Sequence, residues 1–240
     1  METSLFFKTI TLVSIALGLV FAPALSFVLG CRTAHQRGER FLGLTFEANT
    51  NAAGDLDLHP TAESSKRLDH WFKRLFFLNA LFMIVMLLAT PSSLIGGVLA
   101  LFASALTFGP LLGIIMLMID EVDGMRAMGL TLLVSVAAAC FGMFSGLDLS
   151  FLRTVLLGGL IVLIGFSLLG LIVSFSSMVR RLKAILGAGL FTLFLMFDFQ
   201  RLATLEDAGS NDWSTALELA IHIYLDVINL LLEILAAMGE

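Results

Sequence analysis

Ile221-His222-Ile223-Tyr224-Leu225-Asp226-Val227-Ile228-Asn229-Leu230 is the centre of the last apolar segment of the chain, residues 215–238. A helix of about 20 apolar residues spans the hydrocarbon core of a bilayer, and this segment is long enough. It nevertheless carries four polar residues at spacings of four, three and four: His222, Asp226, Asn229 and Glu233. These spacings place them on one face of a helix. An ionised side chain in the membrane costs at least about 2.5 kcal/mol, so we expect this face to point into a helix bundle or a wet cavity.

A second acidic residue, Asp198, lies one segment earlier among phenylalanines and large aliphatic residues. A short polar loop joins its segment to the last one. This arrangement predicts that the two helices pack as antiparallel neighbours. Asp198 and Asp226 would then meet inside the bundle.

The composition predicts the fold class. Of 240 residues, 58% are hydrophobic and 14% are charged, whereas a soluble domain is about 45 to 50% apolar. We therefore predict an all-α polytopic membrane protein, a bundle of seven transmembrane helices in a single membrane domain over residues 1–240. The expected spans are residues 5–30, 71–89, 94–119, 128–144, 151–175, 184–202 and 215–238, with a polar loop at 31–70 and a turn within it at 51–55.

The first span has an alternative interpretation. Val28-Leu29-Gly30-Cys31 resembles a lipoprotein cleavage box, and cleavage there would remove residues 1–30 and acylate Cys31. However, the apolar run is longer than an ordinary signal core, and the residues at its start include one lysine and one glutamate. We therefore interpret it as a transmembrane helix. Cys31 and Cys140 show neither metal-ligand spacing nor a disulfide framework.

The basic residues predict the orientation. Eleven of the 14 lysines and arginines follow the first, third or fifth span, on the side that also holds the carboxyl terminus. The positive-inside rule places this side in the cytoplasm and the amino terminus outside. We expect an integral protein of the cell's inner (plasma) membrane, with the lipid bilayer as its surroundings. The chain has no basic run of the kind that binds nucleic acid.

Several motifs resemble the Bax inhibitor-1, or transmembrane Bax inhibitor motif, family. The most specific are Phe-Asp-Phe-Gln at 197–200 and Ile-Tyr-Leu-Asp-Val-Ile-Asn-Leu at 223–230. Residues 105–110, which end in Gly-Pro, and residues 145–152, which contain Asp-Leu-Ser, are also similar to family patterns. The resemblance covers the region from the third span to the end. It implies a seven-helix fold, a pH-sensitive calcium leak of the bacterial type, and a paired-aspartate sensor at Asp198 and Asp226.

The family also suggests an alternative function. Some prokaryotic relatives are described as modulators of a membrane AAA protease, and eukaryotic relatives as suppressors of cell death. A non-conducting regulator that binds such a protease or another membrane protein is therefore the alternative. The calcium-leak members carry a basic residue at the end of the second span as a latch, but residues 86–90 contain none. Either Arg201 or Arg74 serves instead, or the latch is absent.

The polar residues of the last two spans suggest a chemistry. Two carboxyl groups in contact cannot both ionise cheaply, so a shared proton would make the pair a proton-dependent switch. Carboxylate and amide oxygens are also hard ligands suited to calcium. The predicted pH sensor and ion path comprise Asp198, Asp226, Asn229 and Glu233, with Asp198 and Asp226 as candidate calcium ligands. Calcium and protons are the expected ions, and no resident cofactor is expected.

Purely structural roles compete with this interpretation. Asp198 would pair with Arg201 three residues on, and His222 would lie at the membrane boundary. Asn229 would bond a neighbouring helix, a contact worth about 0.6 kcal/mol. An intramembrane enzyme is disfavoured, because the sequence shows no paired Ser and His on adjacent spans, no metal-binding His motif and no Gly-Asp protease signature beside Asp198 or Asp226.

Overall fold

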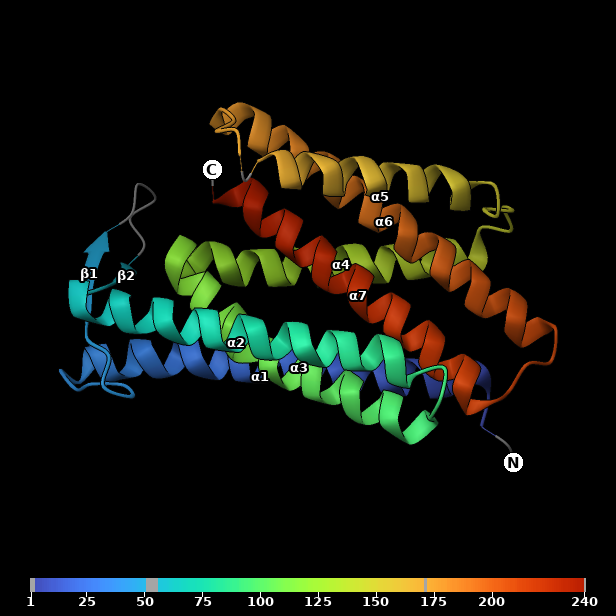
Figure 1. Ribbon diagram of the computed structural model, residues 1–240, viewed down its shortest axis with the longest axis horizontal. Coiled ribbons are helices and arrows are strands. Elements are labelled where there is room, and N and C mark those ends of the chain that lie inside the picture. Colours follow the sequence, from blue (N-terminus) through green and yellow to red (C-terminus); the bar gives the residue numbers. More distant parts are fainter. Residues whose placement is uncertain (1–2, 51–55, 171, 240) are drawn as a thin grey trace. The chain divides into compact units, whose positions relative to one another are not determined.

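The computed structural model describes residues 3–50, 56–170 and 172–239. In this part of the chain there are seven α-helices and one two-stranded hairpin (Figure 1). Their bounds are α1 Leu5–Gln36, β1 Phe46–Thr50, β2 Leu56–Pro60, α2 Ala62–Ala89, α3 Leu94–Ile119, α4 Glu121–Phe144, α5 Leu152–Leu169, α6 Ser177–Asp207 and α7 Trp213–Met238. All seven helices are long and apolar enough to cross a membrane, which confirms the predicted all-α seven-helix class.

Two compact units make up the described chain. One consists of Thr11–Met125, which contains most of α1, the hairpin, α2 and α3. The other contains the start of α1 and the chain from Arg126 onward, including α5, α6 and α7. The single membrane domain expected from the sequence stays a prediction.

Most helices extend beyond the predicted spans. Only α3 has the bounds expected, whereas α2 begins at Ala62 instead of residue 71 and α6 covers Ser177–Asp207 instead of 184–202. Hydropathy detects the part of a helix that lies in lipid, but backbone hydrogen bonding continues through polar residues outside it. The first turns of α2, for example, carry the ion pairs Glu63–Arg67 and Asp69–Lys73 at i,i+4 spacing.

The predictions for two segments were wrong in part. α5 ends at Leu169 instead of residue 175, and Phe175 folds back so that its ring stacks on Phe166 at a centroid distance of 4.5 Å. The expected polar loop 31–70 contains the end of α1, an antiparallel hairpin and the first turns of α2. Leu44 and Leu58 are fully buried there, so the segment is packed against the rest of its unit and is not an open loop. The turn expected at 51–55 lies outside the described residues.

Close backbone contacts pack the helices of the Thr11–Met125 unit. A Cβ atom placed on Gly109 of α3 would lie 2.8 Å from the carbonyl oxygen of Val20 in α1. Only glycine permits this approach, because any side chain would collide with backbone. α2 and α3 form an antiparallel hairpin, in which Asn79 Nδ2 donates to the Ser104 carbonyl oxygen at 2.8 Å.

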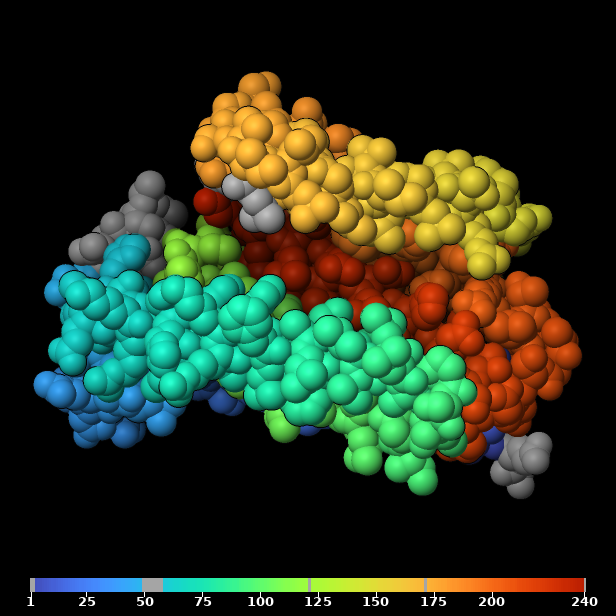
Figure 2. Space-filling model, in the orientation of Figure 1, coloured from blue at the N-terminus to red at the C-terminus, as the bar shows by residue number. Residues whose placement is uncertain are grey.

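The other unit is organised around α7. Buried residues make up 67% of the apolar stretch of α7 but only 6% of that of α5, so α5 is the lipid-facing helix of this unit. Figure 2 shows the side of α5 that no other helix covers in this view. The start of α1 is attached to the loop before α7, where Lys8 Nζ donates to the Asn211 carbonyl oxygen at 2.7 Å and lies 5.3 Å from the Trp213 ring.

Candidate functional site

The candidate site lies in the hairpin of α6 and α7, which run antiparallel and side by side (Figure 1). Gly209 turns the chain after α6 with a φ of 82°, which favours glycine. Asp212 then caps α7, because its carboxylate accepts hydrogen bonds from the Thr215 backbone N–H at 2.8 Å and the Thr215 hydroxyl at 2.7 Å. These bonds hold the pKa of Asp212 below its ordinary value. The short loop thus aligns the polar faces of the two helices.

Asp198 and Asp226 meet in the middle of the hairpin. Their carboxyl groups lie within hydrogen-bonding distance of each other. Two carboxylates only accept hydrogen bonds, so a bond between them requires a proton on one. Among the described residues, no other donor reaches the buried Oδ2 atom of Asp226. Asp198 itself is only 3% exposed, so the contact lies in the interior of the protein.

Three charged or polar residues surround Asp198 toward the α6–α7 loop. His222, Arg201 and Glu218 lie close enough to interact with it electrostatically. The Arg201 guanidinium, however, is bonded to Glu218 of α7 at 2.8 Å. Arg201 is therefore engaged by another carboxylate in this structure, and its role as a latch for the aspartate pair stays a prediction. His222 is exposed, and its position at the membrane boundary stays a prediction.

Glu233 lies at the opposite end of the hairpin and has a different partner. Lys183 Nζ of α6 donates to Glu233 Oε1 at 2.9 Å, and the two side chains are 25% and 11% exposed. Gly187 makes room for the acid, since a Cβ atom there would lie 2.7 Å from Glu233 Cδ. Glu233 is seven residues from Asp226, which is about 10 Å of helix. The structure therefore separates Glu233 from the aspartate pair.

The candidate ion path and calcium ligands are only partly brought together. Asn229, half-buried, follows Asp226 on the same face of α7. Calcium takes six to eight oxygen ligands, and two carboxyl groups supply at most four. Among the described residues, no group of three or more His, Cys, Asp or Glu side chains could hold a metal ion. Calcium binding by Asp198 and Asp226 stays a prediction.

Polar contacts therefore occur at three levels of the hairpin. Lys183–Glu233 lies near the start of α6, Asp198–Asp226 in the middle, and Arg201–Glu218 near the loop. The two carboxyl groups can hydrogen-bond only if one of them carries a proton, whereas each of the other two contacts joins a basic side chain to an acidic one.

Two residues of this arrangement were missed by sequence reasoning. Lys183 is one of the eleven basic residues that predict the orientation, and Glu218 is not among the predicted site residues. Glu218 precedes His222 by four residues and so extends the polar face of α7, a signal that was present in the sequence. Lys183 gave no comparable signal, because its partner lies 50 residues away.

Comparison with known proteins supports the resemblance seen in the motifs. The family model described as "Inhibitor of apoptosis-promoting Bax1" matches residues 7–240, which is essentially the whole chain. The match thus includes the first two spans, which the motifs did not cover. No curated protein matches the chain. The chain belongs to the Bax inhibitor-1 family.

Proposed function

We propose that this protein is a pH-sensitive calcium leak whose gate is the Asp198–Asp226 pair. The observation that supports the proposal is the contact between the two carboxyl groups on neighbouring membrane helices. Buried acids are expensive in a membrane, and two carboxyl groups in contact are a costly way to join two helices.

The gate follows from the chemistry of the pair. With one shared proton, the carboxyl groups form a hydrogen bond that ties α6 to α7, and the leak is closed. When that proton is lost, two negative charges face each other and repel, so the middle of the hairpin separates. The same carboxylates then attract a cation, and calcium prefers such oxygen ligands. The leak therefore increases as the pH rises.

Two ion pairs, one on either side of the gate, limit how far α6 and α7 can separate. Lys183–Glu233 and Arg201–Glu218 hold the hairpin together at its ends while the middle opens. Asn229 offers a neutral oxygen next to the pair on the same face of α7. The ions would pass along this face.

The test is calcium entry into liposomes that contain the purified protein, measured with an internal calcium dye between about pH 5 and pH 8. We expect entry to rise with pH, by up to about tenfold per pH unit if a single proton controls the gate. In Asp198→Asn or Asp226→Asn, the amide N–H donates to the remaining carboxylate, so the hydrogen bond does not need a protonated carboxyl group. Both variants should therefore leak slowly at every pH.

Asp207→Asn is the matched control, because it makes the same change at an exposed acid at the end of the same helix. We expect it to keep the pH dependence of the parent. Entry equal to that of protein-free liposomes at every pH would contradict the channel function. The alternative, a non-conducting regulator, would then require a membrane protease or other membrane protein that co-purifies with the chain.

A further inference from the structure

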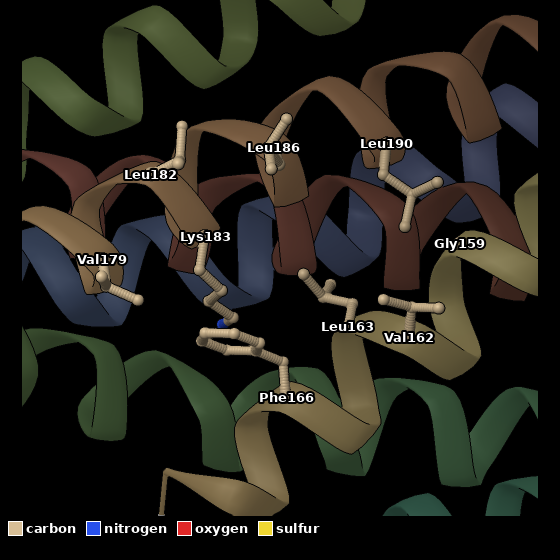
Figure 3. A pocket seen from close by; sticks show the side chains of 9 residues that line it. All are labelled: Gly159, Val162, Leu163, Phe166, Val179, Leu182, Lys183, Leu186 and Leu190. Carbon is tan, nitrogen blue, oxygen red and sulfur yellow. The ribbon is translucent and has the colours of Figure 1, made fainter. Parts of the chain in front are cut away.

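A groove between α5 and α6 lies apart from the aspartate pair. It has a volume of about 330 Å³, within the size range of small-molecule sites. Its walls are almost entirely apolar and include Val162, Leu163 and Phe166 of α5 and Val179, Leu182 and Leu186 of α6. Figure 3 shows these side chains on the two helices, with Lys183 extending from α6 toward the ring of Phe166. A charged lysine side chain is not expected in a site that binds only apolar groups.

The groove continues into a polar cavity at the turn between α5 and α6. This second cavity has a volume of about 400 Å³ and shares Phe166 and Lys183 with the first. It adds the Ser167 and Ser174 hydroxyls and the Arg180 guanidinium. One continuous site thus has a long apolar part and a basic, hydroxyl-lined end.

Lys183 can serve both the hairpin and a ligand. Its ammonium group has three N–H donors, and Glu233 accepts one of them at 2.9 Å. A phosphate oxygen beside it would receive a charge-assisted hydrogen bond, which is stronger than one between neutral groups. Arg180 adds a planar donor group suited to phosphate.

The position of the polar end fits the surface of a bilayer. Lys183 lies six residues after Ser177, the first residue of α6, which is about 9 Å along the helix. Lysine and arginine side chains near the end of a membrane helix extend to the headgroup region. The groove lies beside α5, whose apolar stretch is almost entirely uncovered, so lipid can enter it from the side.

We propose that this groove binds one anionic phospholipid. One acyl chain lies along the apolar walls between α5 and α6. The phosphate lies at the basic end, against Lys183, Arg180 and the Ser174 hydroxyl. This site uses neither aspartate, and it shares only Lys183 with the residues of the proposed calcium leak.

The test uses the full chain in phosphatidylcholine vesicles that contain a small fraction of phosphatidylglycerol with a photoactivatable diazirine on one acyl chain. A parallel sample carries the same diazirine on phosphatidylcholine. After illumination, mass spectrometry locates the labelled peptides. We expect phosphatidylglycerol to label α5 and α6 at the groove in preference to phosphatidylcholine. Calcium entry is not measured, so the outcome does not depend on the proposed function.

Neighbouring glycines provide matched variants for the apolar part. A Cβ atom on Gly159 would point into the groove, 2.8 Å from the flexible Leu190 Cδ1 atom, whereas one on Gly158 meets no atom within 4 Å. Gly159→Leu should displace about two methylenes of the acyl chain and reduce labelling about tenfold. Gly158→Leu should be labelled to the same extent as the parent protein.

Neighbouring arginines provide matched variants for the headgroup. Arg180 lines the polar cavity, and Arg181 does not. Arg180→Gln should reduce the preference for phosphatidylglycerol about fivefold, and Arg181→Gln should leave it unchanged. Equal labelling by the two lipids in the parent would overturn the proposal. The proposal would also be overturned if the two arginine variants had the same preference for phosphatidylglycerol, or if the two glycine variants were labelled to the same extent.

Discussion

The α2–α3 and α6–α7 hairpins are built alike but differ in the chemistry that joins their helices. Each has a short turn, and in each the second helix is capped by a side chain: Ser93 accepts from the Gly96 N–H, and Asp212 from the Thr215 N–H. The interior of α2–α3 is bonded through a neutral amide, Asn79, which donates to Ser104. The interior of α6–α7 is bonded through acids and bases.

This difference predicts where the protein responds to pH. Amide, hydroxyl and carbonyl groups keep their hydrogen bonds at every physiological pH, whereas a carboxyl group changes from donor to acceptor when it loses its proton. We therefore expect the α2–α3 hairpin to be insensitive to pH and the α6–α7 hairpin to respond to it. Substitutions at three places, the Lys183–Glu233 pair, the two helix caps and Asn79, would break or sharpen this contrast.

The largest effect is expected at the Lys183–Glu233 pair. Lys183→Met keeps a long apolar side chain but leaves the Glu233 carboxylate without its partner. Removing one member of a buried ion pair costs about 3 to 5 kcal/mol, and we expect about 3 kcal/mol because Lys183 is 25% exposed. Thermal unfolding of the purified protein in detergent measures the loss.

The double variant Lys183→Met/Glu233→Leu is the control for this effect. It removes both charges and leaves two apolar side chains in contact, so most of the stability should return. If the double variant is as unstable as the single one, the loss comes from packing and not from an unpaired charge.

A smaller effect is expected at the two helix caps. Asp212→Ala and Ser93→Ala should each reduce the free energy of unfolding by about 1 kcal/mol at neutral pH. The Thr215 backbone N–H and hydroxyl lower the pKa of Asp212 in the folded protein, so its cap contributes stability above the pKa of the unfolded chain. That contribution is lost as the pH falls through the lower folded pKa. The cost of Asp212→Ala should therefore shrink below about pH 4, and that of Ser93→Ala should not.

Unfolding by denaturant at several pH values measures this difference. Asp212→Asn is a further control, since its amide oxygen keeps the cap but does not titrate in this range. A cost for Asp212→Ala that stays constant from neutral pH to about pH 3 would contradict the assignment of the cap to an ionised carboxylate.

The smallest effect is expected at Asn79. Asn79→Leu removes its bond to the Ser104 carbonyl oxygen, which also accepts from the Thr107 hydroxyl at 3.0 Å and so keeps a partner. Interhelical hydrogen bonds in membranes are worth about 0.6 kcal/mol on average, and we expect a loss of that size. The loss should be equal at acidic and neutral pH. A pH-dependent loss would remove the contrast between the two hairpins.

The polar face of α7 shows how far sequence reasoning reached. Spacings of three and four residues predicted that Asp226, Asn229 and Glu233 share one face, and the short loop predicted that Asp198 lies on a neighbouring helix. Both predictions rest on local rules of helix geometry. The carboxyl contact in the structure agrees with them. The role of that contact as a pH sensor stays a prediction.

The partner of Glu233 could not be predicted from the sequence. Glu233 was grouped with Asp226 because the two share a face of α7. In the structure it bonds Lys183, a residue whose apparent role was to flank the membrane. Charge near a span is common in every membrane protein, so composition could not distinguish a flanking lysine from one that binds an acid in the bundle.

The sequence by itself determined the seven apolar helices, the class of the protein and the polar face of α7, because hydropathy and helical period are local properties of a chain. Only the tertiary structure decided the two ion pairs of the α6–α7 hairpin: Lys183 with Glu233, and Arg201 with Glu218. It also decided that α5 and α6 leave a groove with a basic end. Both depend on the rotation and axial register of one helix against another, which are set by packing between residues far apart in the chain.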